Sequence, residues 1–532
     1  MITNIRVFVL LLAVLAAAAV VASRSKIPAA ILLVLIGLTL SLTPGLPAME
    51  LAPEFVLLLI LPPVIYSSAF NMSWPEFRFN LRPITLMSVG GVLFTAVAVA
   101  AVAHELMGFD WPVGFLLGAI ISPPDAVAPL AIARGMEIPR RILVVLEGEG
   151  LANDAAALIL YRFALASVGA GVFSLGGAAG AFAAIVAGEI IWGVGVGWLM
   201  LRVRRWANES LVEIVMSILT PFLAFWPPEH LGGSGVLATV AAGLYTSFNG
   251  PRLISSTTRL QGVFFWQFFM YVIEGMVFLI TGLQARTISS RIDEFPLSQL
   301  ALFVAVIASV AIVARFLWVF AAVYLPRALF PPIRKYDPSP PWRWVFLLGF
   351  TGVRGIVSLA AALAIPFETF GGRPFPDRDL ILLLTFALIL ITLVGQGLLL
   401  PFVIRVLGLS HAGRHEREHE IVEEYKARSE AVRAAISSLD QPVAERKLSP
   451  EAIEVIRVLH EDRLKQIEIR AGEGTRQFSE VRDDLERQLI AVERARINEL
   501  YRGGELKDES RRRIERDLDM REAFLFNQRR KT

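Results

Sequence analysis

The sequence predicts an all-α polytopic membrane protein with about thirteen transmembrane helices and a cytoplasmic helical tail. Three observations predict this fold class. Of the 532 residues, 55% are hydrophobic, which is more than an average soluble protein contains. Apolar runs of about 20 residues, the length that crosses a bilayer as a helix, recur up to Leu407. After Leu407 the apolar runs stop and charged residues become frequent. We therefore expect a transmembrane domain over 1–410 and a separate domain over 411–532.

Thirteen apolar runs qualify as spans by length and composition. A cleaved signal peptide is an alternative for the first run, since small residues end its apolar core, but its length favours a retained span. The predicted spans are 5–22, 27–44, 53–71, 82–104, 112–132, 141–165, 175–201, 210–227, 233–248, 262–283, 297–325, 343–365 and 379–407.

The basic residues of the connecting loops indicate an orientation. With thirteen spans, one set of loops carries sixteen Lys and Arg residues, whereas the other set, together with the N-terminus, carries five. Basic loops remain on the cytoplasmic side of a membrane. We expect a cell (inner) membrane protein with its N-terminus outside and its tail in the cytoplasm.

The spans also form two comparable halves, spans 1–6 and 8–13, in which an offset of seven inverts the second half relative to the first. In this register span 5, with Pro123-Pro124-Asp125, corresponds to span 12, with Gly349, Gly352 and Gly355. Paired interrupted helices in inverted repeats are typical of transporter sites near the bilayer midplane. Ordinary glycine packing between helices is the alternative for span 12.

The tail has a soluble composition. It holds 26 of the chain's 51 Lys and Arg and 27 of its 48 Asp and Glu. Apolar residues recur there at helical spacing, which predicts helices over 416–438, 449–471, 477–501 and 507–526. We expect a cytoplasmic helical regulatory domain. The chain has no cysteine, which excludes disulfides and thiol chemistry.

The stretch from Glu147 to Asp154 is the most unusual part of the sequence. It places Glu147, Glu149, Asn153 and Asp154 inside an apolar run, where an isolated charge costs roughly 2.5 kcal/mol or more. Such groups face the protein interior or a water-filled path. A set of internally paired charges that only fixes helix packing is the alternative.

Asp154 and Asp125 are the candidate ion- and proton-binding residues. A buried carboxylate favours its protonated form, whereas a bound cation favours the charged form. A proton and a cation therefore compete for the same group. Asn153 offers an amide next to Asp154 without adding charge, and a helix break beside Pro124 would free carbonyl oxygens near Asp125. Such oxygen ligands suit an alkali cation rather than a transition metal.

Arg354 requires a counter-ion at membrane depth. Glu149 and Glu147 are the candidates, and Glu149 is preferred because it lies on a different helix face from Asp154. We expect a structural Glu149–Arg354 ion pair that joins span 6 to span 12.

Other charged residues within spans are weaker signals. Glu213, Glu274 and Arg315 lie in spans 8, 10 and 11, and Glu189 and Arg162 lie nearer span ends. Interhelical pairing or placement of the charge at the membrane surface explains each at least as well as transport.

Three histidines follow the last span. His411, His415 and His419 share one helical face at i, i+4 spacing,. They are candidates for pH sensing, because histidine changes charge near neutral pH. Metal binding and a simple solvated helix are the alternatives.

Four motifs together resemble a known family: Leu61-Pro62-Pro63, Ser122-Pro123-Pro124-Asp125, Glu147 to Asp154, and Gly352-Val353-Arg354-Gly355-Ile356-Val357-Ser358-Leu359. They are similar to those of bacterial sodium/proton antiporters of the monovalent cation:proton antiporter-1 family, relatives of animal sodium/proton exchangers. The resemblance extends over about 5–407.

The resemblance implies a homodimer of thirteen-span protomers that exchange a monovalent cation for a proton by an elevator-like alternating-access mechanism. It implies that Asp154 is the essential ion- and proton-binding carboxylate, that Asn153 and Asp125 support it, and that Glu149 pairs with Arg354. An Asn at position 153 implies electroneutral exchange. It implies no cofactor, no enzymatic activity and no nucleic-acid partner.

Three positions depart from the family pattern. Pro124 replaces a frequent Thr, Gly150 a frequent Ser, and Ser67 a frequent acidic residue. These changes remove oxygen ligands, so both Na⁺, the first choice, and K⁺ stay open as the transported cation. Two alternative functions stay open. One is a cation channel, which would need a repeated filter, and the other is a membrane sensor that signals through the tail.

Overall fold

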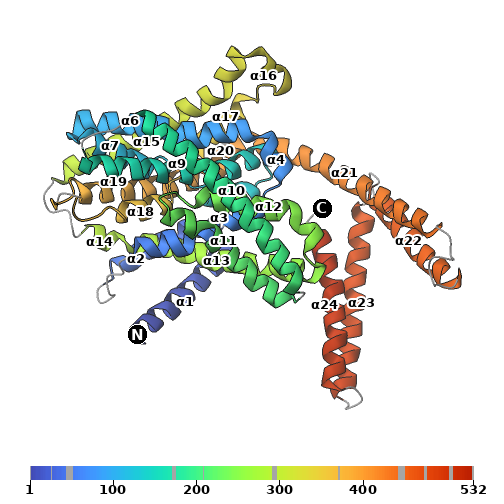
Figure 1. Ribbon diagram of the computed structural model, residues 1–532. Coiled ribbons are helices and arrows are strands. Elements are labelled where there is room, and N and C mark those ends of the chain that lie inside the picture. The colour runs from blue at the N-terminus through green and yellow to red at the C-terminus, as the bar shows by residue number, and fades with distance from the viewer. Residues whose placement is uncertain are drawn as a thin grey trace. The chain divides into compact units, whose positions relative to one another are not determined.

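Helices dominate the computed structural model of this chain (Figure 1). It describes residues 2–25, 27–43, 52–170, 175–207, 209–289, 296–369, 372–440, 450–471, 476–502 and 507–529. Within these ranges there is no β-strand, and the extended backbone pairs at a single bridge between Glu368 and Pro374. The all-α prediction is confirmed for the described residues.

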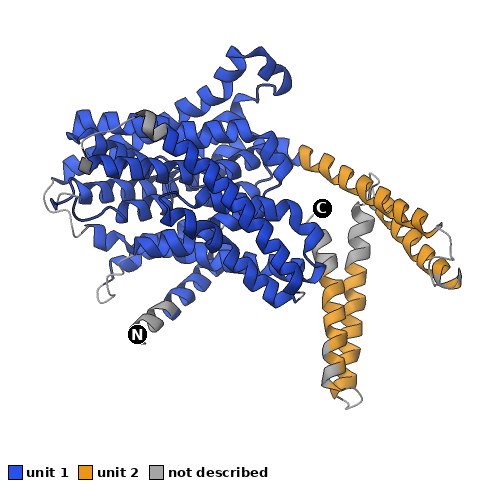
Figure 2. Ribbon diagram, viewed as in Figure 1, with its two compact units in different colours: residues 1–414 blue, residues 415–532 orange. Residues whose placement is uncertain are grey.

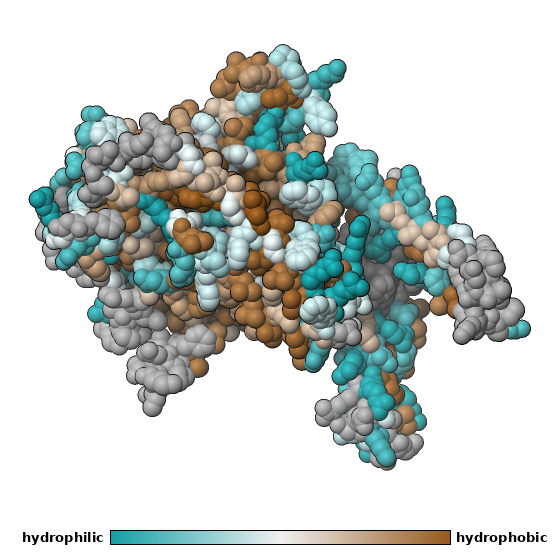
Figure 3. Space-filling model, in the orientation of Figure 1, coloured by the Kyte–Doolittle hydropathy of each residue, from teal (hydrophilic) through white to brown (hydrophobic). Residues whose placement is uncertain are grey.

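The chain divides into two compact units, Met1–Arg414 and His415–Thr532 (Figure 2). The division falls shortly after the predicted boundary at 410/411. Hydrophobic residues are abundant on the visible face of the first unit, whereas the second unit is largely hydrophilic (Figure 3). Large apolar side chains such as Ile191, Phe264 and Leu211 are exposed on the first unit, as lipid-facing side chains are in membrane proteins.

The first half of unit 1 contains helices that match spans 1–7, with a π-helical turn in spans 3 and 4. The elements are α1 (Ile2–Ser25), α2 (Ala29–Ser41), η1 (Phe55–Ile60) continuing into α3 (Leu61–Asn71), α4 (Trp74–Phe79), α5 (Leu81–Thr85) continuing through η2 (Leu86–Gly90) into α6 (Gly91–Met107), α7 (Trp111–Ile121), α8 (Val127–Arg134), α9 (Arg140–Ala170) and α10 (Leu175–Ala207).

The second half of unit 1 contains helices that match spans 8–13. The elements are α11 (Ser210–His230), α12 (Val236–Leu253), α13 (Ser256–Leu283), α14 (Ala285–Ser289), α15 (Leu297–Leu329), α16 (Pro331–Tyr336), α17 (Trp342–Phe350), α18 (Ile356–Leu363) and α19 (Arg378–Leu390), which continues through η3 (Ile391–Gln396) into α20 (Gly397–Val406). The predicted spans 8 and 9 ended too early, because α11 and α12 continue to His230 and Leu253.

Six helical stretches in the described chain are long and apolar enough to cross a membrane: Leu81–Met107, Gly180–Ala207, Ser210–His230, Ser256–Ile288, Leu297–Leu329 and Arg378–Val406. Shorter apolar helices lie at Val9–Arg24, Ala29–Ser41, Phe55–Asn71 and Trp111–Ile121. Helix α9, whose central turns carry several carboxylates, is not in either set.

Spans 5 and 12 are each two short helices separated by non-helical residues, 122–126 between α7 and α8 and 351–355 between α17 and α18. Helices α7, α18 and α19 lie side by side, so one half of each broken span is buried among neighbours (Figure 1). Leu116, Ile120, Ala361 and Ile381 belong to this core, whose burial from water or lipid leaves little room to move. The breaks are therefore placed within a densely packed part of unit 1.

Helix α13 is positioned by a different contact. A Cβ atom on Gly37 of α2 would lie 2.2 Å from the carbonyl oxygen of Leu279, and one on Gly282 would lie 2.2 Å from that of Val34. Because only glycine permits this approach, the backbones of α2 and α13 touch directly. The position of α13 is thereby fixed by α2 and does not depend on the broken helices.

Unit 2 consists of long helices: α21 (Leu409–Ser437), which begins in unit 1 and ends in the short turn η4 (Ser438–Asp440), then α22 (Pro450–Ala471), α23 (Arg476–Arg502) and α24 (Asp508–Arg529). Helices α23 and α24 pair through the buried Ile490 and Leu518 and through an ion pair of 2.7 Å between Arg494 and Asp519. The four predicted tail helices are confirmed within a few residues, except that α21 begins earlier. The predicted linkers between them lie outside the described residues.

Candidate functional site

The break in span 5 follows from its two prolines. Pro123 and Pro124 have no amide hydrogen, so the carbonyls of the preceding turn lose their helical donors. The hydroxyl of Ser122 donates to the carbonyl oxygen of Ala119 at 3.2 Å and replaces one of them. Other freed carbonyls accept hydrogen bonds from other segments of the chain.

The two breaks satisfy each other across the crossing of spans 5 and 12. The amide of Asp125 donates to the carbonyl oxygen of Val353 at 2.7 Å. In return, Nε of Arg354 donates to the carbonyl oxygen of Ile121 at 2.6 Å, the group that Asp125 would have bonded in an unbroken helix. Arg354 also donates to the carbonyl of Gly352, and its own amide donates to Thr392 at 3.0 Å. The arginine therefore holds the unwound backbone of both spans.

Glycines permit the close approach at this crossing. A Cβ atom on Gly355 would lie 2.5 Å from the Cβ of Asp125, and one on Gly150 of α9 would lie 2.6 Å from the Cβ of Ala126. Real side chains do not approach so closely. Gly150, which replaces a hydroxyl residue of the family pattern, thus has a packing reason in this chain.

Helix α9 supplies an amide to the broken span. Nδ2 of the fully buried Asn153 donates to the carbonyl oxygen of Pro124 at 2.7 Å, a carbonyl that the helix break leaves without a helical donor. Asn153 therefore bonds the backbone next to Asp125, and its supporting role in ion binding stays a prediction. The neutral amide holds α9 against the break without adding a charge.

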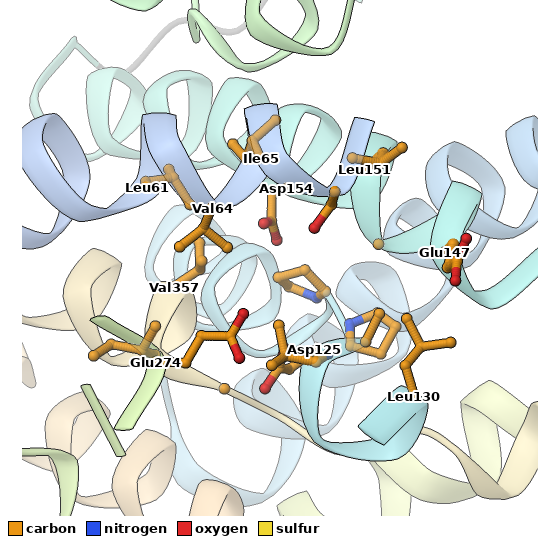
Figure 4. A pocket seen from close by; sticks show the side chains of 18 of the residues that line it. Leu61, Val64, Ile65, Asp125, Leu130, Glu147, Leu151, Asp154, Glu274 and Val357 are labelled. Atoms are coloured by element: carbon orange, nitrogen blue, oxygen red, sulfur yellow. Dashed lines mark hydrogen bonds between the residues drawn. The ribbon is translucent and has the colours of Figure 1, made fainter. Parts of the chain in front are cut away.

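Asp154 and Asp125 face the same cavity, which has a volume of about 210 Å³ (Figure 4). Oδ1 of Asp125 accepts a hydrogen bond of 3.0 Å from the amide of Val127, at the start of α8. Asp154 makes no hydrogen bond or ion pair with any described residue and is half-buried. The cavity has room for a cation together with several waters.

Two groups of elements line this cavity. Residues of the broken spans and α9 form one wall, and residues of η1, α3 and α13 form the other, including Val56, Leu61, Ser68 and Glu274. Figure 4 shows the carboxylates of Asp154, Asp125 and Glu274 near one another in the cavity; Asp154 comes from α9, Glu274 from α13, and Asp125 from the break between α7 and α8. Neighbouring carboxylates cannot all be charged without a cation between them.

The predicted Glu149–Arg354 ion pair is wrong. Glu149 pairs with Arg315 of α15, through bonds of 2.7 Å from Nη1 and 3.1 Å from Nη2. Both side chains are nearly inaccessible to solvent, so the bidentate geometry offsets the cost of burying two charges. Arg354 lies beside this pair in the same small cavity, but its donors are directed to backbone carbonyls because the helix breaks leave these without partners.

Glu147, the other candidate partner of Arg354, has a different role. Nη2 of Arg134, the last residue of α8, lies 2.5 Å from Oε1 of Glu147. Both residues line the cavity of Asp154. Glu147 and Asp154 are seven residues apart on α9 and so share one face of the helix.

Three residues of this region were not predicted as site residues. The signal for Arg315 and Glu274 in the sequence is that each is a charged residue within an apolar span. Sequence spacing cannot show which helices pack together, so it does not place either residue in the site. Ser358, from the first turns of α18, lines the cavity and is buried. It lay inside a quoted motif without a role.

The three histidines are exposed on α21. The rings of His415 and His419 lie 4.8 Å apart between centroids, and His415 lies 4.0 Å from Glu418. Within the described residues, no three His, Cys, Asp or Glu side chains are close enough together to hold a metal ion. The pH-sensing role of His411, His415 and His419 stays a prediction.

A comparison with known protein families identifies the class of protein to which this fold and cavity belong. Residues 9–406 match the transmembrane sodium/hydrogen exchanger family. The chain belongs to this family of cation/proton antiporters, which are multi-pass membrane transporters and not enzymes.

Individual relatives agree with this assignment. An uncharacterised Na⁺/H⁺ exchanger of Mycobacterium tuberculosis is 32% identical over 98% of this chain and 96% of its own length. The sodium, potassium, lithium and rubidium/H⁺ antiporter of Bacillus subtilis is 33% identical over 71% of this chain and 58% of its own length. In fold, the chain is similar to the sodium proton antiporter MjNhaP1 from Methanocaldococcus jannaschii, with a TM-score of 0.61, 19% identity, and coverage of 77% of this chain and 98% of that one.

We predict that Glu149 couples more strongly to Arg315 than to Arg354. Replacing Glu149 or Arg315 alone with Gln leaves a buried charge unpaired and should lower the free energy of unfolding by about 3 kcal/mol or more. The measurement is a double-mutant cycle on unfolding of the lipid-reconstituted protein, run once for each pair. Strong coupling of Glu149 to Arg354 together with additive losses for Glu149 and Arg315 would contradict the pairing.

Proposed function

We propose that this protein is a secondary antiporter that exchanges a monovalent cation for a proton at Asp154. The observation that carries the proposal is the carboxylate of Asp154, which has no partner among the described residues and lies in a cavity next to Asp125, bordered by two broken helices. A carboxylate without a protein partner at membrane depth binds either a proton or a cation. Because the proton and the cation exclude each other at Asp154, transport of the cation in one direction is coupled to transport of the proton in the other.

Na⁺ is the proposed main cation, and K⁺ is the alternative. The family is described by sodium/hydrogen exchange, but the Bacillus subtilis relative is named for sodium, potassium, lithium and rubidium. Oxygen ligands and a water-containing cavity suit any of these hard cations. The proposed exchange is electroneutral, because Asn153 adds no titratable group beside Asp154 and is engaged with Pro124.

An elevator-like alternating-access movement is the proposed mechanism. The broken spans, α9 and α15 are joined by the crossing and by the Glu149–Arg315 pair, so they are expected to move together. The opposite wall, on α3 and α13, would remain still while the other slides past it. We propose thirteen spans in two inverted repeats, a homodimer, and an inner-membrane orientation with the N-terminus outside and the tail in the cytoplasm, in agreement with the loop charges.

Replacing Asp154 with Asn should abolish exchange while leaving the protein folded. An amide of the same size cannot exchange a proton or supply a charge. The measurement is proton flux in proteoliposomes on addition of Na⁺ or K⁺, with Glu105→Gln, an exposed residue of α6, as the charge-matched control. Near-normal coupled flux in Asp154→Asn would refute the proposal. An uncoupled current in the unmodified protein would indicate a channel, and no flux would favour a sensor.

The tail is proposed to regulate exchange and not to conduct ions. The backbone of Gly413 packs against Glu137, and Arg414 lies 3.4 Å from the same residue, so a truncation after Arg414 preserves the contacts that end unit 1. We expect the truncated protein to exchange cations, with a pH profile shifted relative to the full chain because His415 and His419 are removed. Loss of exchange at every pH in a truncated protein that inserts and remains folded would show that the tail belongs to the transport machinery.

A further inference from the structure

A third carboxylate, that of Glu274, faces the cavity of Asp154 and Asp125. Glu274 lies in the middle of α13 and lines the cavity together with both aspartates. In Figure 4 its carboxylate points toward the space between them. It is therefore not part of the crossing of spans 5 and 12, although it shares the cavity that the crossing creates.

Glu274 differs from the other acidic residues that the sequence places within spans. Glu213 lies 4.0 Å from Arg204 and accepts a bond from Thr258. Glu189 accepts bonds from the amides of Ser234, Gly235 and Leu237 at the start of α12. Each of these carboxylates has structural partners, as a charge in an apolar surrounding requires.

Glu274 makes no hydrogen bond or ion pair with any described residue, although it is partly buried. The basic side chain that borders the same cavity, Arg134, is paired with Glu147. A carboxylate in the membrane that is not paired by the protein is a functional group by default. Packing alone thus does not account for Glu274.

A second, independent group in the cavity also lacks a partner. The side-chain oxygen of Ser358 is buried and has no hydrogen-bond partner among the described residues, and the residue is 2% exposed. Ser358 lines the same cavity from α18. Leaving a buried hydroxyl unpaired costs about 1–3 kcal/mol, so an occupant of the cavity is expected to bind it.

We infer that Glu274 and Ser358 complete the cation site that Asp125 and Asp154 begin, with Glu274 binding the hydrated cation from the opposite wall. The inference rests on the proposed antiport function and names the site's remaining ligands. Among the described residues, no three His, Cys, Asp or Glu side chains are placed to bind one metal ion directly. The cavity has room for a cation that keeps part of its water shell. The hydroxyl of Ser358 supplies the oxygen ligand that Pro124 and Gly150 do not.

The affinity for the cation should depend on how the two walls of the cavity are placed. Glu274 is on the wall formed by α13, and Asp125 and Asp154 are on the other wall, so all three act on one cation only when the walls face each other as they do in this structure. The cation is then held more tightly in this state than after the walls have moved apart. Loss of Glu274 therefore weakens cation binding without removing the carboxylate at which proton and cation exchange.

The test is the cation dependence of exchange by the full-length protein in proteoliposomes, measured with Na⁺ and separately with K⁺. We expect Glu274→Gln to raise the KM for the cation about tenfold, with a smaller change in maximal rate, and Ser358→Ala to raise it less. Glu105→Gln on α6 and Gln267→Ala, an exposed position of α13 itself, are the controls and should retain the KM of the unmodified protein.

A folded Glu274→Gln variant with an unchanged KM for both cations would overturn the inference, and an unchanged KM in Ser358→Ala would remove the hydroxyl from the site. If Glu274→Gln does not fold, Glu274→Asp keeps the charge but shortens the side chain, and an unchanged KM in that variant would equally refute a ligand role. The proposed function fails separately, if the unmodified protein shows no cation-driven proton flux. If the unmodified protein exchanges cations for protons and the Glu274 variants have the same KM as the unmodified protein, only the assignment of Glu274 as a ligand is contradicted.

Discussion

The reciprocal bonding of two unwound backbones is the interaction on which the rest of the structure depends. Two prolines end α7 and leave carbonyls without donors, and Arg354 from the break of span 12 satisfies the carbonyl of Ile121. The amide of Asp125 in turn bonds the carbonyl of Val353. Unsatisfied backbone groups are prohibitive inside a membrane. Each broken helix is thus stable only because the other is broken at the same depth, and this mutual dependence positions Asp125 beside Asp154.

The charges around the crossing divide into a set that is bonded within the protein and a set that faces the cavity. Glu149 with Arg315, and Arg354 with backbone carbonyls, have all their main bonds within the protein. Asp154 and Glu274 have none in the described chain, and Asp125 has one from the backbone amide of Val127. Because buried ionised groups require a partner, the first set can stay fixed while the second set requires a proton or a cation. In the proposed mechanism, the structural bonds and the binding of the transported ions therefore depend on different residues.

The sequence predicted the helices and the breaks well, because apolar length, proline and glycine act locally. Asp154, Asp125 and Asn153 could be chosen as candidate site residues for the same reason, since charged and polar side chains within an apolar run have few explanations. The partner of Glu149 could not be predicted, because Arg315 and Arg354 are both buried cations and the choice depends on how α15 packs against α9. Glu274 and Ser358 reach the cavity through tertiary packing of α13 and α18, which no spacing along one helix reveals. The direct contact of α2 with α13 at Gly37 and Gly282 is of the same kind.

The central claim is that a proton and a cation compete for the carboxylates of one cavity. Proton release on cation binding tests it most directly. Purified full-length protein in a weakly buffered detergent solution near neutral pH would be mixed with Na⁺ or K⁺, and the released protons counted with a pH indicator, with choline as the control cation. The account predicts release of about one proton for each cation bound, as competition for a shared group requires. Saturable cation binding without proton release would contradict it.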